Sequence, residues 1–160
     1  MRAAIADPFL PASADPVAHW HALLATNLSA PYLLTHALHA ASLLAPAASI
    51  VHVSSTRALQ AEPHTEAYSA AKAGLLGLAR AQAMSLAPLH VNAVLPGWID
   101  TSGEALRPED HAWHPAGRVG RPADVAEMCL FLADGARSGF VTGQSFVVDG
   151  GVTAKMVYPE

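Results

Sequence analysis

The chain has 160 residues, of which 52% are hydrophobic and 14% are charged. This balance excludes a disordered chain and indicates one globular domain with elements buried on both faces. The formal net charge is −4 and the sequence has no basic run. The composition therefore argues against a nucleic-acid surface and against a patch that binds anionic membranes.

No apolar stretch reaches the roughly 20 residues that a membrane-spanning helix needs. Residues 1–14 lack the continuous apolar region of a signal peptide. The single cysteine, Cys129, cannot form an internal disulfide, and no set of cysteines and histidines has zinc-finger spacing. These features favour a cytoplasmic protein without a membrane segment.

The first predicted element is a long helix. Asp15 can cap it, and Pro16 suits the first helical position. Apolar residues then recur at helical spacing over 17–44. Pro31 falls inside this pattern, so we expect a kink or a loosened turn near Asn27.

The rest of the chain alternates between predicted strands and helices. Short β-branched runs bounded by turn residues predict strands, and longer Ala- and Leu-rich stretches predict helices. This alternation predicts an α/β fold with a parallel sheet and helices on both faces. In chain order the elements are a strand at 48–55, a helix at 65–86, a strand at 90–95, a loop with at most one short helix at 102–121, a helix at 122–132 and a strand at 145–148.

Tyr68 and Lys72 lie one turn apart in the helix predicted at 65–86, so the ammonium would stand beside the phenol. A nearby positive charge lowers the pKa of a phenol. A tyrosine tuned in this way can exchange a proton with a substrate oxygen near neutral pH. Taken alone, however, such a pair is more often simply solvated on a helix surface.

Other polar and turn residues fall where a parallel α/β sheet places its ligand contacts. Ser55 ends the first predicted strand, and Pro96 and Gly97 end the second. Asn27 lies in the stretch that Pro31 disturbs, where its side chain or a freed carbonyl could hold a water. We therefore expect a site at the carboxyl edge of the sheet.

Together these residues resemble the short-chain dehydrogenase/reductase family. The resemblance runs from about residue 3 to residue 151 and rests on motifs in the family's order. They are Thr26-Asn27-Leu28-Ser29-Ala30-Pro31, the strand end Ser54-Ser55, Tyr68-x-x-x-Lys72, Val91-Asn92-x-Val94-x-Pro96-Gly97-x-Ile99-x-Thr101, Gly120-Arg121-Pro122, and Val141-Thr142-Gly143-Gln144 leading to Asp149-Gly150-Gly151.

The resemblance implies an NAD(P)-dependent oxidoreductase that interconverts an alcohol and a ketone or aldehyde. Tyr68 would be the general acid/base, and Ser55 would orient and polarise the substrate oxygen. Lys72 would lower the pKa of Tyr68 and bind the nicotinamide ribose, and Asn27 would hold a water that links Lys72 to a proton relay. The cofactor itself carries the hydride. The residues implied to line the nicotinamide and diphosphate side of the cofactor are Pro96, Gly97, Ile99 and Thr101.

The sequence departs from the family in lacking its glycine-rich phosphate-binding turn. The residue that selects NAD or NADP is missing as well, so both remain open. We interpret residues 1–160 as a single partial domain, the catalytic and C-terminal part of a Rossmann-like doubly wound parallel sheet with about three strands. One edge of the first strand would then lack its neighbour. Either the chain is a truncated form of a longer enzyme, or it is a degenerate, non-catalytic member that acts as an oligomerisation partner.

The expected substrate is a small alcohol or carbonyl compound, and the resemblance implies a homodimer or homotetramer. Two histidine pairs, His36 with His39 and His111 with His114, have helical spacing that could ligate a metal. Without a third ligand they are better interpreted as surface or core histidines, so no metal site is predicted. His111, Trp113 and His114 lie in the segment that covers the substrate in this family.

Overall fold

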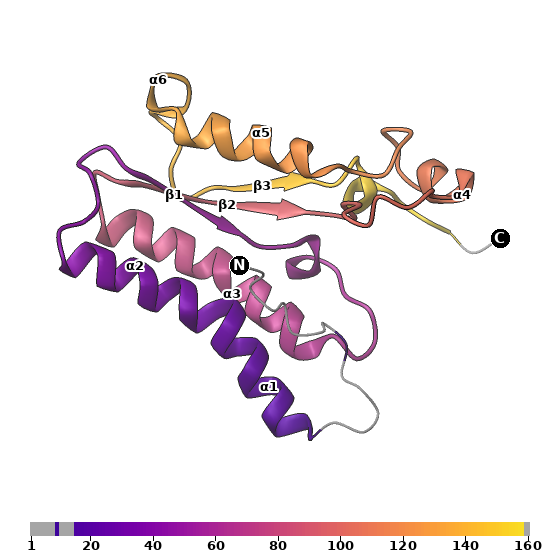
Figure 1. Ribbon diagram of the computed structural model, residues 1–160, viewed down its shortest axis with the longest axis horizontal. Helices are drawn as coiled ribbons and strands as arrows, with labels where there is room; N and C mark the ends of the chain where they lie inside the picture. The colour runs from indigo at the N-terminus through magenta and orange to yellow at the C-terminus, as the bar shows by residue number, and fades with distance from the viewer. Residues whose placement is uncertain (1–8, 10–14, 159–160) are drawn as a thin grey trace.

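The computed structural model describes residue 9 and residues 15–158. Its described part contains a parallel sheet with helices on both faces, which confirms the predicted α/β class (Figure 1). The strand order is β1-β2-β3, and both neighbouring pairs are parallel. The strands are β1 (Ser49–Val53), β2 (His90–Pro96) and β3 (Ser145–Val148).

The long helix predicted at the start of the chain is divided by a wider turn. Asp15 caps it as expected, because its carboxylate accepts a hydrogen bond from the Val17 N–H at 2.9 Å. The last helical residue is Ala40 rather than Leu44, and the chain then turns through Ser42, whose φ is 56°. The segments are α1 (Pro16–Leu24), a π-helical turn (Ala25–Ser29) and α2 (Ala30–Ala40).

The helices cover the sheet from two sides (Figure 1). α3 packs against β2 on one side and also contacts α1, while α5 contacts all three strands from the other side. None of the helices within the described residues is both long and apolar enough to cross a membrane. The helices that follow β1 are α3 (Glu66–Ser85), α4 (Pro108–Ala112), α5 (Pro122–Ala133) and the short α6 (Gly135–Ser138).

The core lies between α3 and the sheet. Small alanines on α3 allow the helix to approach the β-branched and leucine side chains of β2 closely. The buried cluster consists of Ala79, Ala83, Val91, Ala93 and Leu95. His52 of β1 is also buried there, and its Nε2 hydrogen-bonds Gln82 Oε1 of α3 at 2.7 Å.

Strand β1 forms the edge of the sheet in the part of the chain that the structure describes. The Ser54 N–H donates to the Val94 carbonyl, so alternate residues of β1 turn their backbone groups toward β2. The backbone groups of Ser49, Val51 and Val53 therefore face the opposite, open side. One of them is capped by a side chain, because Lys72 Nζ donates to the Val53 carbonyl at 3.1 Å.

Candidate active site

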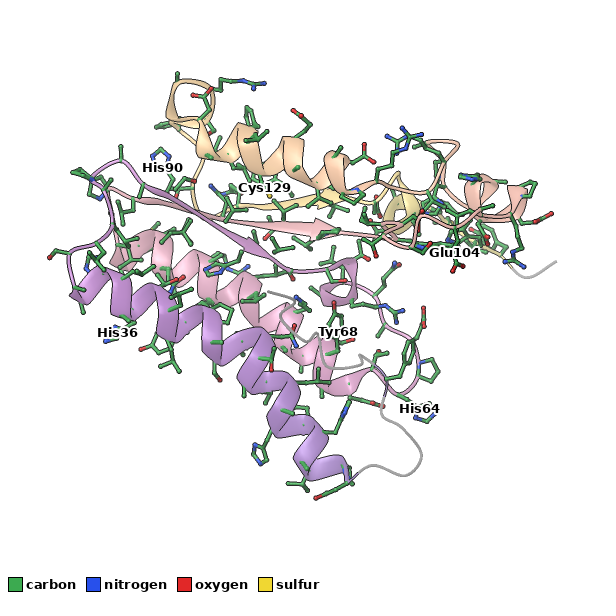
Figure 2. All side chains as sticks on the ribbon, viewed as in Figure 1. His36, His64, Tyr68, His90, Glu104 and Cys129 are labelled. Atoms are coloured by element: carbon green, nitrogen blue, oxygen red, sulfur yellow. The ribbon has the colours of Figure 1, made fainter. Side chains whose placement is uncertain are left out.

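The end of β1 fixes the position of helix α3. Ser54 is buried, and its hydroxyl donates to the backbone carbonyl of Lys72 at 2.8 Å. Figure 2 shows Tyr68 on the part of α3 that lies near the turn following β1. The bond from Ser54 therefore sets where the side chains of Tyr68 and Lys72 stand relative to Ser55.

Ser55 and Tyr68 meet at this point. The Ser55 Oγ accepts the Arg57 N–H at 3.2 Å. Burial raises the pKa of Tyr68 above its ordinary value, while the nearby Ser55 hydroxyl and the positive charge of Arg57 act in the opposite direction and are outweighed. Tyr68 therefore stays protonated near neutral pH.

Lys72 stands beside Tyr68 but does not act on it as the sequence suggested. Its ammonium lies 5.4 Å from the centre of the Tyr68 ring and donates to the Val53 carbonyl. Burial lowers the pKa of Lys72. The charge that lowers the pKa of Tyr68 is that of Arg57, and burial outweighs it. In this structure the net shift of the Tyr68 pKa is upward, and the catalytic role expected of Lys72 stays a prediction.

Asn27 occupies the π-helical turn. Pro31 has no N–H to donate, and the helix widens just before it, so the predicted loosening near Asn27 is confirmed. The Asn27 side chain is buried, and its Nδ2 donates to the Leu23 carbonyl at 3.2 Å. Asn27 and Lys72 line one cavity of about 490 Å³ beside β1.

A second cavity, of about 370 Å³, lies on the other side of Ser55. Two indole rings form much of its wall, so we refer to it as the tryptophan cavity. Its lining includes Ser55, Arg57, Gly97, Trp98, Trp113 and His114. The candidate catalytic serine thus shares this space with residues from the segment expected to cover the substrate.

The four residues expected on the cofactor side are not gathered in one place. Gly97 lines the tryptophan cavity, and a Cβ added there would lie 2.6 Å from Asp149 Cβ, so close packing requires glycine. Ile99 lines a different cavity, of about 570 Å³, beside α5 and β3. Pro96 ends β2 and Thr101 is exposed, and neither lines the two cavities near Ser55.

The two histidine pairs differ in their surroundings, because the side chains of His111 and His114 bond the backbone and those of His36 and His39 are exposed. His114 is buried, and its Nδ1 bonds the Asp110 carbonyl at 2.9 Å, while His111 Nδ1 accepts the Val119 N–H at 3.3 Å. His36 and His39 are exposed on α2 (Figure 2 labels His36). No group of three or more metal-ligating side chains is found within the described residues.

Two polar residues of the tryptophan cavity lie outside the motifs that point to the site. Arg57 forms an ion pair with Glu62, with 2.6 Å between Nη2 and Oε1. In the sequence, His114 stands out only as one of a pair of histidines and as part of the segment expected to cover the substrate. No local spacing identifies Arg57, because it faces Ser55 and Tyr68 only once α3 has packed against the end of β1.

The chain thus forms a parallel α/β sheet with Ser55, Tyr68 and Lys72 at its carboxyl edge. Residues 2–153 match a family model described as enoyl-(acyl carrier protein) reductase. The chain belongs to the short-chain dehydrogenase/reductase family.

Relatives and solved structures agree with this assignment. An uncharacterized oxidoreductase of Thermotoga maritima is 44% identical over 91% of this chain and 61% of its own length. A cis-4-hydroxycyclohexanecarboxylate dehydrogenase of Sinomonas cyclohexanicum is 41% identical over 95% and 64%. A gluconate 5-dehydrogenase of Burkholderia cenocepacia, solved with NADP and tartrate, is 27% identical with a TM-score of 0.77, over 90% of this chain and 59% of its own. The chain thus spans about three fifths of these proteins' length.

Proposed function

We propose that the chain carries the catalytic residues of an NAD(P)-dependent oxidoreductase that interconverts an alcohol and a ketone or aldehyde. The observation that carries the proposal is the position of Tyr68, whose phenol is influenced by the Ser55 hydroxyl and whose ring has the Lys72 ammonium 5.4 Å from its centre. Membership of an oxidoreductase family supports it. The substrate is a small molecule that enters the tryptophan cavity, which Ser55 lines.

Tyr68 acts as the general acid in carbonyl reduction. Its raised pKa keeps the phenol protonated, and the protonated form is the one that can give a proton to the developing alkoxide. The Ser55 hydroxyl donates a hydrogen bond to the same substrate oxygen and orients it. In the oxidation direction Tyr68 must first lose its proton, and the charge of Arg57 favours that step.

The bound cofactor supplies or accepts the hydride. Lys72 is suited to bind the nicotinamide ribose of the cofactor. Its ammonium has three hydrogens, and the structure shows one of them bonded to the Val53 carbonyl. The side chain of Asn27 lines the same cavity and is placed to hold a water between Lys72 and solvent. The 160 residues contain no glycine-rich turn for the diphosphate. The residues present fit the nicotinamide-ribose end of the cofactor, which is NAD or NADP.

The alternative role is that of a non-catalytic partner of another chain. Within the described residues no strand pairs with the outer edge of β1, and this favours the partner role, because unpaired strand edges associate with other strands. Titration of the purified chain with NADH and NADPH separates the two roles, with tryptophan quenching and energy-transferred nicotinamide emission as readouts. Saturable binding together with carbonyl reduction supports the enzyme, and no binding up to millimolar cofactor supports the partner role.

We also propose a homodimer or homotetramer in the cytoplasm. Large apolar side chains remain exposed on the described helices, among them Leu33 and Leu34 of α2 and Leu130 of α5, and exposed apolar surface favours association. Sedimentation velocity would measure the assembly directly, and a monodisperse monomer would refute it.

A further inference from the structure

Arg57 offers an unused hydrogen-bond donor. Its side chain is 23% exposed, and Nη2 is engaged by Glu62 at 2.6 Å. The other terminal nitrogen, Nη1, is fully buried and has no hydrogen-bond partner in the described part of the chain. A guanidinium N–H only donates, and leaving such a group buried and unpaired is costly. Because Nη1 has no exposed surface, a ligand oxygen reaches it only when the Arg57 side chain turns toward the cavity.

His114 has the second unpartnered atom. The residue is 2% exposed, and its Nδ1 faces the Asp110 carbonyl, which can only accept, so Nδ1 carries the hydrogen. Nε2 is then a buried acceptor without a partner. Within the described residues, Arg57 Nη1 and His114 Nε2 are the only buried side-chain nitrogen or oxygen atoms in this state, and both residues line the tryptophan cavity.

The charges around the cavity favour an anion. Lys155 lies with its ammonium 3.6 Å from the centre of the Trp113 ring and donates to the Trp113 carbonyl. Arg57, Glu62 and Lys155 together line an adjoining space of about 310 Å³. The side chains of Arg57 and Lys155 thus bring two positive charges to this side of the site. Glu62 brings one negative charge, and its carboxylate is paired with Arg57.

Two indole rings give the cavity an apolar side, and Thr56, Gln60 and Glu62 make other parts of its lining polar. Trp98 and Trp113 line the cavity, and the ring of Trp98 lies 5.8 Å from the ring of His114. Indole faces pack well against saturated or aromatic rings. The cavity therefore combines an apolar wall with an unpaired cationic donor, and Ser55 lies on the same lining.

We propose that the tryptophan cavity binds a substrate with an apolar skeleton that bears a carboxylate, a hydroxy acid or the matching oxo acid. The Arg57 side chain turns so that its guanidinium donates to the carboxylate, the indole rings hold the skeleton, and His114 lines the same cavity. This assignment rests on the proposed function, because it places the reacting oxygen at Ser55 and Tyr68. Arg57 is then the residue that determines specificity for acids.

Ligand binding tests the proposal without cofactor or turnover. The purified chain is titrated with cyclohexanecarboxylate and, separately, with cyclohexanemethanol, which keeps the ring and lacks the charge, while the fluorescence of Trp98 and Trp113 is followed. We expect saturable binding of the carboxylate, and binding of the alcohol at least about ten-fold weaker, because hydrogen bonds to charged groups are the stronger ones. Equal affinities, or no binding of the carboxylate, would overturn the proposal.

Substitutions of Arg57 test whether its guanidinium binds the carboxylate. Arg57→Gln should weaken carboxylate binding at least about ten-fold, and Arg57→Lys should restore part of it. Arg80→Gln removes an exposed arginine of α3 and should bind as the unaltered chain does. Unchanged binding by a folded Arg57→Gln variant would overturn the proposal.

A second variant covers the case in which Arg57→Gln fails to fold. Glu62→Gln removes the competing carboxylate and should tighten cyclohexanecarboxylate binding several-fold, whereas unchanged or weaker binding would count against the site. Tyr68→Phe should bind the carboxylate normally and lose turnover. If the unaltered chain binds the carboxylate but Tyr68→Phe does not change turnover, the proposed function has failed and the acid site stands. If Tyr68→Phe loses turnover but the chain does not prefer the carboxylate, only the acid site has failed.

Discussion

The ammonium of Lys72 donates to the backbone carbonyl of Val53, 3.1 Å away, on the outer edge of strand β1. The same lysine stands beside the ring of Tyr68. One side chain therefore serves both the candidate active site and the open edge of the sheet. A ribose hydroxyl would compete for the hydrogens of this ammonium, whereas a backbone N–H of a strand that pairs with β1 would compete with the ammonium for the Val53 carbonyl.

Replacing Lys72 with methionine should separate these two roles. Lys72→Met keeps the apolar stem and removes the donor, so we expect at least about a hundred-fold loss of carbonyl reduction, within the range for groups that support proton transfer. Stability should change little. The lost bond to Val53 costs about 1 kcal/mol, and removing an ammonium whose pKa is lowered by burial offsets that loss.

Steady-state kinetics and thermal melting of the Lys72→Met variant check this expectation. Arg80→Met, on the exposed face of the same helix, is the matched control and should leave both properties unchanged. If Lys72→Met retains full turnover, the role of Lys72 in the site is refuted.

Removing the Tyr68 hydroxyl should abolish proton transfer. Tyr68→Phe is expected to lower kcat/KM for carbonyl reduction by about 10²- to 10⁴-fold, because the phenol is the proton donor. The ring remains, so the melting temperature should stay close to that of the unaltered chain. Tyr158→Phe removes an exposed phenol near the C-terminus and should retain full activity. A Tyr68→Phe variant as active as the Tyr158→Phe control would contradict the assignment.

His52 should make the fold sensitive to acid. Burial lowers the pKa of His52 below its ordinary value of about 6.5. Below that value the unfolded chain takes up a proton that the folded chain resists, so stability falls as the pH drops toward the folded-state pKa. The slope is at most about 1.4 kcal/mol per pH unit for one proton.

Urea denaturation between pH 7.5 and pH 5 measures the contribution of His52. His52→Gln should flatten the dependence on pH, since its amide does not titrate and can still bond Gln82. His36→Gln, an exposed histidine on α2, should keep the original slope. Identical slopes for the two variants would show that His52 does not titrate differently on unfolding.

Gly97 is held to glycine by packing against Asp149. An added Cβ would lie 2.6 Å from the Asp149 Cβ and 3.0 Å from its Cα, and backbone atoms cannot easily move aside. Gly97→Ala should therefore destabilise the chain by about 1–3 kcal/mol in urea denaturation. Gly135→Ala, where nothing lies within 4 Å of the new Cβ, is the control and should stay within about 1 kcal/mol. Equal stability of both variants would show that the strand ends can separate freely.

The spacing of apolar residues along the chain predicts the strands of the sheet and the longer helices that cover it. The strand at 145–148 has its predicted bounds, and α3 and α5 begin and end within a residue of expectation. The helix end at Ala40 was missed because the left-handed Ser42 carries no local signal, and α6 was missed because one turn is too short to show periodicity. The assignment of residues 1–160 to a single partial domain stays a prediction.

The spacing of residues in the sequence predicts part of the candidate active site and misses Arg57. Tyr68 and Lys72 were found because one turn of helix relates them, and Ser55 because strands end at a shared edge. The electrostatic role of Arg57 depends on how α3 packs against the end of β1, which sequence spacing does not encode. The catalytic roles of Tyr68, Lys72, Ser55 and Asn27, and the cofactor contacts of Pro96, Gly97, Ile99 and Thr101, stay predictions.

The π-helical turn at Ala25–Ser29 holds one residue more than an α-helical turn would. Each residue of an α-helix advances the chain by about 100° around its axis. Deleting one residue from this turn would restore regular winding and rotate everything on its N-terminal side by about that angle. Leu23, now fully buried, would swing out of the core while α2 stayed in place. The extra residue thus shifts which side chains of α1 face the core relative to those of α2, and the buried position of Asn27 depends on this shift.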